Sequence, residues 1–266
     1  MVLAGILLMA SAPPAGSTAG RPAIAAHRGG ARLWPENSLT AFRGALGLKA
    51  DLVELDVHQT RDGEVVVVHD PTLERTTTGR GAVRDLTWAE LAAVTVRGTA
   101  EERLPRLAEV LALLQPAPAG LLLEIKAGPG GDRYPGIEER VLGLVEAAGL
   151  APRTTVMAFD WRILERLRAL SMSIRLTGLL SQRGAERLGG IGSAALRLRA
   201  LGVNDLGIEQ TLLTPAAVSA ARDAGLSIGV WTVNEPEELR RALAAGVDYV
   251  TTDRPDLALR LRDAPP

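Results

Sequence analysis

The sequence lacks cysteine altogether, and its 266 residues include only 3% aromatic residues. The absence of cysteine excludes disulfides, thiolate zinc sites and thiol nucleophiles. The scarcity of aromatic residues leaves Leu, Val, Ala and Ile to fill the core. There is no excess of either charge, because 30 basic and 31 acidic residues give a net charge of −1. Proteins that bind nucleic acid through its phosphates usually carry a basic excess, so we expect no nucleic-acid partner.

A long hydrophobic run is also missing. The apolar stretch Val2–Ala10 is too short to span a bilayer, so we expect no stable membrane insertion. Small residues and prolines follow it, as in a signal peptide, but no positively charged segment precedes it. We therefore interpret residues 1–20 as a signal-like or disordered N-terminal tail, which leaves a cytoplasmic and an exported location open. Residues 21–266 are expected to form a single domain whose oligomeric state is open.

Apolar residues make up 47% of the chain, enough for a sizeable core. Short apolar runs alternate with longer amphipathic stretches, which is typical of a parallel sheet covered by helices. The expected strands are Ala23–His27, Leu52–His58, Leu121–Lys126, Thr155–Phe159, Arg175–Leu180, Gly207–Glu209, Ser227–Val233 and Tyr249–Thr252. The expected helices are Ser38–Leu48, Leu107–Leu114, Ile137–Ala148, Trp161–Leu170, Ala194–Leu201, Pro215–Ala224 and Glu237–Ala245. Eight such strands close a TIM (β/α)8 barrel, which is the predicted α/β fold; an open doubly wound sheet is the alternative.

One further strand, Glu64–His69, follows the second expected barrel strand too closely for a parallel crossover. The two should therefore form an antiparallel hairpin, with Asp62-Gly63 at its turn. If these are the two central turn residues, His69 lies opposite Asp56. Residues from 59 to about 104 then become a small insertion over the C-terminal face of the barrel.

Carboxylates gather at the expected strand ends. Glu54 and Asp56 are two residues apart, so their side chains point to the same face, and Glu124 and Lys126 end the next barrel strand. TIM barrels carry their active sites at the carboxyl ends of their strands. A structural ion pair, such as Glu124 with Lys126, would explain the presence of any one of these acids, but not of all three at adjacent strand ends. An all-oxygen ligand set favours one divalent cation, Mg²⁺ or Ca²⁺, over zinc.

Two of the three histidines fall beside the same predicted site. His27 ends the first strand and His69 ends the hairpin, which suits one general base and one general acid. The third, His58, lies on the same strand face as Glu54 and Asp56. It could support the site residues from behind or belong to the barrel rim, and we favour the rim. Arg28 and Lys126 would supply positive charge to an anionic substrate.

Six N-terminal motifs, followed by four later ones, carry a resemblance to a known family. In chain order they are His27-Arg28-Gly29, Pro35-Glu36-Asn37-Ser38, Glu54-Leu55-Asp56-Val57, Arg61-Asp62-Gly63, Val68-His69-Asp70, Leu73-Glu74-Arg75-Thr76-Thr77, Leu123-Glu124-Ile125-Lys126, Trp231-Thr232-Val233-Asn234, Gly246-Val247-Asp248 and Thr252-Asp253. Together, over about residues 23 to 257, they resemble the glycerophosphodiester phosphodiesterase family. The resemblance implies a TIM barrel with a small insertion. It also implies metal-dependent hydrolysis of a small-molecule glycerophosphodiester to sn-glycerol 3-phosphate and an alcohol.

The resemblance further implies roles for residues of this chain. The implied ligands of the cation are Glu54, Asp56 and Glu124. The implied acid/base pair is His27 and His69; we favour His27 as the base, with the order left open. The residues implied to bind the phosphate or wall the substrate pocket are Arg28, Glu36, Lys126, Phe159 and Trp231. Asn37 or Ser38 is expected to cap the first helix.

Alternatives and departures accompany the resemblance. A lysophospholipase D-type phosphodiesterase of the same fold is one alternative, although few aromatics are available to line a lipid groove. A barrel that binds ligands without catalysis is another alternative. It predicts that some of the catalytic and metal-binding residues are missing, whereas both histidines, the three carboxylates, Arg28 and Lys126 are all present. Ser38 stands where the family usually has Thr, and Tyr249 where it usually has Gly. The segment 96–103 lacks the aromatic residues that the family often has there. We expect these three departures to affect the shape of the pocket for the leaving group.

Overall fold

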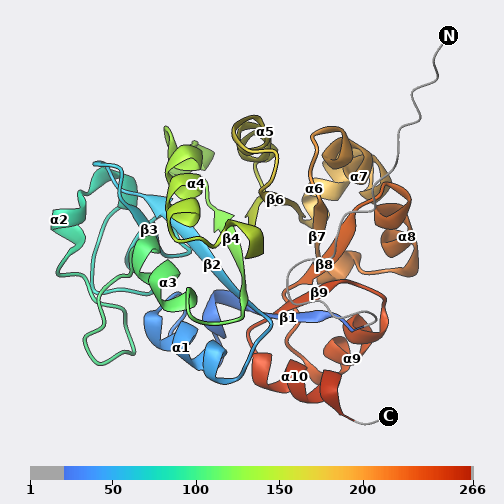
Figure 1. Cartoon of the computed structure of the whole chain (residues 1–266), viewed down its shortest axis with the longest axis horizontal. Coiled ribbons are helices and arrows are strands. Elements are labelled where there is room, and N and C mark those ends of the chain that lie inside the picture. The colour runs from blue at the N-terminus through green and yellow to red at the C-terminus, as the bar shows by residue number, and fades with distance from the viewer. Residues whose placement is uncertain (1–20, 265–266) are drawn as a thin grey trace.

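The computed structural model describes residues 21–264, so the predicted N-terminal tail lies outside the described residues. Eight parallel strands run in the order β1-β9-β8-β7-β6-β5-β4-β2, and pairing of β1 with β2 closes the barrel. The strands are β1 Ala23–Ala26, β2 Leu52–Gln59, β3 Val65–Val67, β4 Gly120–Ile125, β5 Thr154–Ala158, β6 Arg175–Leu180, β7 Asp205–Glu209, β8 Ser227–Trp231 and β9 Tyr249–Thr252. The predicted TIM barrel is therefore confirmed, and the open sheet is excluded (Figure 1).

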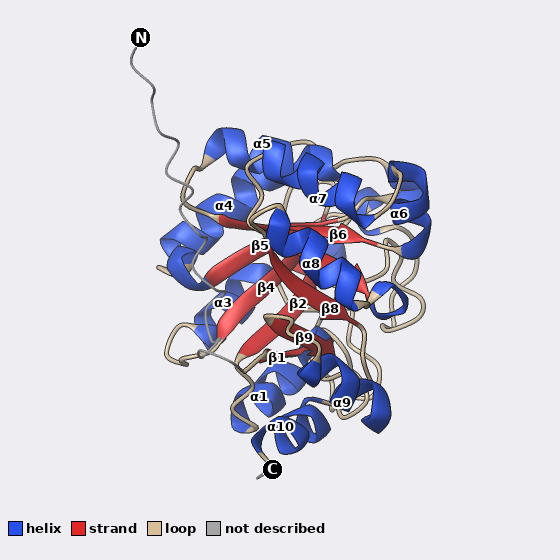
Figure 2. Ribbon diagram, turned by 90° about the vertical axis from the view of Figure 1, so that its right-hand side faces the viewer, coloured by secondary structure: helices blue, strands red, loops and turns tan. Residues whose placement is uncertain are grey.

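Helices surround the strands on the outside of the barrel (Figure 2). They are α1 Leu39–Gly47, α2 Trp88–Leu91, α3 Leu107–Leu114, α4 Ile137–Ala147, α5 Trp161–Leu170, α6 Gln182–Leu188, α7 Ile191–Ala200, α8 Pro215–Asp223, α9 Pro236–Ala244 and α10 Pro255–Asp263. Sequence analysis did not predict α6 or α10. Helix α6 is only 7 residues long and buries only Ala185, so it shows no clear apolar period. Helix α10 is amphipathic, with Pro255 and Ala258 buried, and its pattern was overlooked. Within residues 21–264, none of these helices combines the length and the hydropathy that crossing a bilayer requires.

Tyr249 fills much of the barrel interior. It is 1% exposed and packs there with Leu122, Met157 and Leu179. A Cβ on Gly229 would lie 2.0 Å from the Tyr249 ring, so only glycine at that position leaves room for the ring. The departure from the family pattern at Tyr249 is thus accommodated within the barrel, where Tyr249 also lines the pocket at the carboxyl ends of the strands.

The β2–β3 hairpin forms as predicted, but its register differs by one residue. Val57 pairs with Val67, and the backbone N of Val68 donates to the carbonyl of Asp56 at 3.0 Å. The prediction that His69 lies opposite Asp56 was therefore wrong. The loop has three central residues instead of two, and Gly63 occupies its left-handed position at φ 89°.

Candidate active site

A pocket of about 200 Å³ opens at the carboxyl ends of the barrel strands. Most predicted site residues line it, and they are His27, Arg28, Glu54, His69, Glu124, Lys126, Phe159 and Trp231. Strand β2 continues past the barrel to pair with β3, so Glu54 and Asp56 lie in its middle, not at its end. Barrel closure brings these residues together from strands that are distant in sequence.

The three predicted metal ligands form one buried cluster. Glu54, Asp56 and Glu124 are 2%, 1% and 7% exposed, and each offers an oxygen within 4.8 Å of the others. Asp56 and Glu124 are register partners on neighbouring strands β2 and β4. Glu54 reaches the same point because side chains two residues apart share a face.

The electrostatics of this cluster are those of a cation site. Burial and the Asp56 carboxylate raise the pKa of Glu54 to about 8, and burial also raises the pKa of Glu124. Lys126 and Arg28 hold the pKa of Asp56 far below its usual range despite its burial. Ionising all three acids together is therefore unfavourable unless further positive charge is added.

The chemistry of the donor set fits a hard divalent cation. Oδ1 of Asp56 is buried and accepts no hydrogen bond from the described residues, although Nζ of Lys126 lies 3.5 Å away. The three side chains offer only oxygen atoms, which Mg²⁺ and Ca²⁺ prefer. The simpler alternative was a structural ion pair, and such a pair is observed: Lys126 Nζ lies 2.8 Å from Glu124 Oε1. Among the described residues, Lys126 forms ion pairs with Asp56 and Glu124 but not with Glu54.

Arg28 binds the carboxylate cluster with both its backbone and its side chain. Its backbone N donates to Glu54 Oε2 at 2.7 Å, and its Nε lies 3.5 Å from Asp56 Oδ2. Arg28 has φ 51°, which is uncommon for a residue with a side chain, and Asn37 N donates to its carbonyl at 2.9 Å. Glu36 accepts a hydrogen bond from Arg28 Nη1 at 2.9 Å, and so belongs to the site through Arg28.

Each candidate catalytic histidine is paired with a carboxylate at Nδ1. His27 Nδ1 lies 2.6 Å from Asp253 Oδ1, and His69 Nδ1 lies 2.7 Å from Asp70 Oδ1. Asn234 Nδ2 donates to the other oxygen of Asp253 at 2.7 Å. Such pairing orients the ring and leaves Nε2 for proton transfer.

The electrostatic surroundings of the two histidines shift their pKa values in opposite directions. Burial lowers the pKa of His27, but Glu54 and Asp253 outweigh that effect and raise it overall. The pKa of His69 is lowered, chiefly by burial and further by Lys126 and Arg28. The two imidazoles therefore differ in proton affinity.

Several residues of the site were not assigned roles from the sequence. Asn37, which was considered only as a possible helix cap, binds Asp56 instead: its Nδ2 donates to Asp56 Oδ2 at 2.9 Å, and its Oδ1 accepts from Asp56 N at 3.3 Å. Its φ of 55° suits asparagine, which tolerates the left-handed region. Ser38 is the helix cap, because its Oγ accepts from Ala41 N at 3.0 Å. A second such residue is Arg75, which bridges Glu36 and Asp70.

His58 was placed wrongly. It is fully buried, not a rim residue, and both of its ring nitrogens have partners. Burial lowers the pKa of His58 to about 4. Its burial was not predicted, because Tyr134 is 76 residues away in the chain and the His69 carbonyl reaches His58 only through the observed hairpin register.

Two aromatic side chains form one wall of the pocket. The rings of Phe159 and Trp231 meet edge to face with centroids 5.3 Å apart, and Trp231 Nε1 donates to the carbonyl of Gly207 at 3.0 Å. Phe159 is 45% exposed, so this wall reaches the surface. Nζ of Lys126 lies 6.0 Å from the Phe159 ring.

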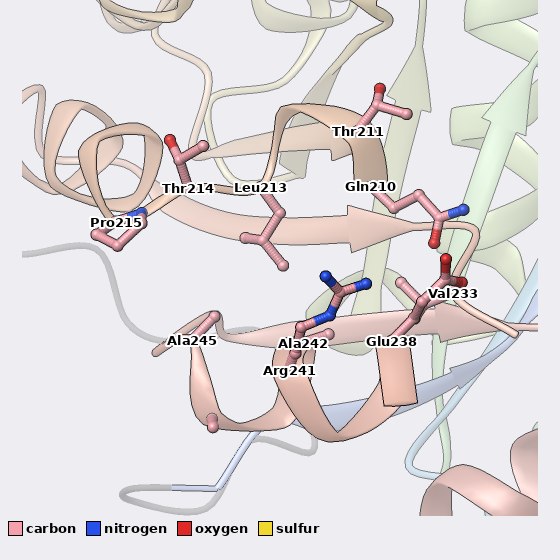
Figure 3. Close-up of a pocket in the computed structure, with 11 residues that line it drawn as sticks. Gln210, Thr211, Leu213, Thr214, Pro215, Val233, Glu238, Arg241, Ala242 and Ala245 are labelled. Carbon is pink, nitrogen blue, oxygen red and sulfur yellow. The ribbon is translucent and has the colours of Figure 1, made fainter. Parts of the chain in front are cut away.

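A larger cavity, of about 640 Å³, lies between residues 210–215 and helix α9 (Figure 3). Its polar side chains include Gln210, Thr214, Glu238 and Arg241. No histidine lines it, and Glu238 is the only acid among its lining residues. The residues able to perform acid/base or metal chemistry thus gather in the smaller pocket.

Known proteins share this fold and sequence pattern. The model of the "Glycerophosphoryl diester phosphodiesterase family" matches residues 27–257. A glycerophosphodiester phosphodiesterase of Caldanaerobacter subterraneus subsp. tengcongensis is 33% identical over 243 residues, covering 90% of this chain and 96% of that protein. A crystal structure from Agrobacterium tumefaciens, assigned as a glycerophosphoryl diester phosphodiesterase, superposes with a TM-score of 0.87 at 31% identity, covering 91% and 98% of the two chains. An Oleispira antarctica phosphodiesterase, solved in complex with the product sn-glycerol-3-phosphate, has a TM-score of 0.78 at 26% identity, covering 92% and 98%.

Proposed function

The chain belongs to the glycerophosphoryl diester phosphodiesterase family, and on that premise we propose that it hydrolyses glycerophosphodiesters to sn-glycerol 3-phosphate and an alcohol. One observation carries the proposal. A buried cluster of three carboxylates shares a single pocket with two histidines, each paired with its own carboxylate. A phosphate diester needs its charge neutralised and two protons moved, and this pocket offers groups for each task.

Glu54, Asp56 and Glu124 would hold Mg²⁺ or Ca²⁺. When bound, the cation supplies Lewis acidity towards a non-bridging phosphate oxygen. Arg28 and Lys126, which line the same pocket, add positive charge for the phosphate. Phe159 and Trp231 would contact the apolar parts of the substrate. Glu36 keeps the Arg28 guanidinium in place through their 2.9 Å hydrogen bond.

The proposed reaction transfers two protons through the histidines. His27 accepts the proton of the nucleophile, either water or the glycerol 2-hydroxyl, as its oxygen bonds to phosphorus. His69 donates a proton to the departing alkoxide as the bond between phosphorus and the oxygen of the leaving alcohol breaks. The 2-hydroxyl route passes through a cyclic phosphate, which water then opens. General acid and base catalysis are each worth about 10²- to 10⁴-fold.

The assignment of base and acid rests on charge and exposure. The raised pKa of His27 owes most to Glu54. A cation held by Glu54 would offset that influence and favour the neutral imidazole that a base requires. His69 has a 29% exposed side chain against 17% for His27, so it is better placed beside an alcohol departing to solvent.

The test is release of sn-glycerol 3-phosphate by the purified protein from glycerophosphocholine and glycerophosphoethanolamine. We expect turnover that EDTA abolishes and that Mg²⁺ or Ca²⁺ restores. Lysophosphatidylcholine should be a poorer substrate; a reversed preference would instead support the lysophospholipase D-type alternative. Inactivity on all three substrates in protein shown to bind the cation would contradict the proposed function.

A further inference from the structure

His58 contacts two loops that flank the candidate active site. It is completely buried on β2, on the same face as Glu54 and Asp56. Its Nε2 lies 3.0 Å from the backbone carbonyl of His69, and its Nδ1 lies 2.7 Å from the hydroxyl of Tyr134. Nothing in the proton-transfer scheme above uses His58, although it is one of only three histidines in the chain.

The direction of one of these hydrogen bonds follows from the atoms themselves. A carbonyl oxygen only accepts, so Nε2 of His58 must carry a proton and donate to His69. In the neutral ring Nδ1 then accepts, and the Tyr134 hydroxyl donates to it. Tyr134 thereby selects the tautomer that binds His69.

The carbonyl of His69 needs this donor because regular pairing stops just before it. Strand β3 ends at Val67, and the last ladder hydrogen bond runs from Val68 N to the Asp56 carbonyl. Beyond that point the chain turns into the insertion. The His58 bond therefore fixes the first peptide outside the ladder, which carries the candidate catalytic imidazole.

The Tyr134 side of the contact fixes the second loop. Tyr134 is 5% exposed and meets the His58 ring edge to face at 5.6 Å. It belongs to the segment between β4 and α4, which begins with Lys126. Gln59, the next residue of β2, also donates to this segment, at the Pro135 carbonyl, 3.2 Å away.

We propose that His58 is a positioning residue: it holds the His69 backbone, and Tyr134 holds His58, so that the His69 imidazole keeps its place over the carboxylate cluster. This inference rests on the proposed function for its effect on turnover. A displacement of about 1 Å at a reacting group can cost about 10²-fold in rate, so a buried backbone anchor can matter as much as a direct contact.

The variants that test this differ in one hydrogen bond. His58→Leu removes the hydrogen bonds to both His69 and Tyr134 and fills the space with an apolar side chain. His58→Gln offers an amide N–H that reaches about as far as Nε2. Tyr134→Phe keeps the ring and removes the hydroxyl. We expect His58→Leu to lower kcat by about 10- to 100-fold with little change in KM. His58→Gln should recover at least about half of that loss in kcat on a logarithmic scale. Tyr134→Phe should lower kcat less than His58→Leu does, because the hydrogen bond from His58 to His69 remains.

A second readout does not depend on turnover. Three histidines give three imidazole Cε1–Hε1 signals in an NMR spectrum, and His69→Ala identifies that of His69. In His58→Leu the His69 signal should shift or broaden, and in His58→Gln it should return towards its original position. Equal turnover of His58→Leu and the wild type would overturn the proposal, as would an unmoved His69 signal. So would His58→Gln behaving no better than His58→Leu. If the wild type hydrolyses no glycerophosphodiester, the proposed function fails, and the NMR comparison still decides whether His58 positions His69.

Discussion

Nδ1 of His27 lies 2.6 Å from Oδ1 of Asp253, a carboxylate 226 residues further along the chain. Pairing of β1 with β9 in the barrel creates this contact. Asn234 fixes the other oxygen of Asp253, so the carboxylate is held from two sides. The pair defines the direction in which His27 presents its second nitrogen.

Asp253→Asn should therefore impair catalysis more than binding. An amide can present either its oxygen or its NH₂ group to Nδ1, so the ring loses its fixed tautomer and orientation. We expect kcat to fall by roughly 10²-fold with KM nearly unchanged. The matched control is Glu235→Gln, which changes an exposed acid whose ion-pair partner is the exposed Arg32. If Asp253→Asn turned over substrate as fast as Glu235→Gln, His27 would not depend on Asp253.

Removal of either candidate catalytic imidazole should slow turnover without unfolding the barrel. We expect His27→Ala and His69→Ala each to lower kcat by about 10²- to 10⁴-fold. Both side chains line the pocket outside the buried hydrophobic clusters, so thermal unfolding and cation binding should change little. Steady-state kinetics alongside calorimetry would check both points. Near-normal turnover in either variant would remove that histidine from the proton-transfer scheme.

Stability without a cation should fall as the pH rises. The pKa of Glu54 is raised from 4.5 to about 8 in the folded protein, so folding favours its protonated form. That contribution is complete below about pH 4.5 and is lost as the pH rises towards 8. The raised pKa of Glu124 acts in the same direction.

Unfolding temperatures measured in EDTA between pH 5 and 8 would test this, with Glu54→Gln as the control because it cannot ionise. We expect the wild type to lose stability across this range and Glu54→Gln to lose less. Parallel curves for the two proteins would show that Glu54 titrates as an ordinary surface acid.

Truncation of Tyr249 should destabilise the barrel. Tyr249→Ala removes a buried ring that Gly229 has made room for, at a cost of about 3–5 kcal/mol in the free energy of unfolding. Tyr249→Phe keeps the ring and is the matched control, with a much smaller expected change. Denaturant unfolding of both variants would measure the difference. If Tyr249→Ala were as stable as Tyr249→Phe, the interior of the barrel would have to collapse readily around the missing ring.

The barrel was predictable because most of its helices and strands carry an apolar pattern strong enough to identify them from sequence. Helix α6 was missed because it is short and buries only Ala185, whereas the amphipathic pattern of α10 was overlooked. The hairpin register was missed for a different reason: the three-residue loop and the two-residue loop share the same Asp62-Gly63 dipeptide. One extra loop residue then shifts every pair along the strands.

The convergence of Glu54, Asp56 and Glu124 was predictable from strand alternation together with the family motifs, but the residues that support them were not. Asp253 reaches His27 only because β9 lies beside β1 in the closed barrel. Asn37 holds Asp56 from a turn whose positive φ is not evident in the motif. His58 receives one partner from Tyr134, which is 76 residues away, and the other from His69 at the end of its own hairpin, so its surroundings depend on the folded chain.

The central claim is that Glu54, Asp56 and Glu124 hold the cation on which diester hydrolysis depends. The most direct measurement is a titration of metal-free protein with Mg²⁺ or Ca²⁺, in which binding and glycerophosphocholine turnover are followed in the same samples. We predict that the two half-saturating concentrations coincide in the wild type and that both binding and turnover are weakened together in Asp56→Asn. Full turnover in the absence of bound cation, or unchanged cation affinity in Asp56→Asn, would contradict the account.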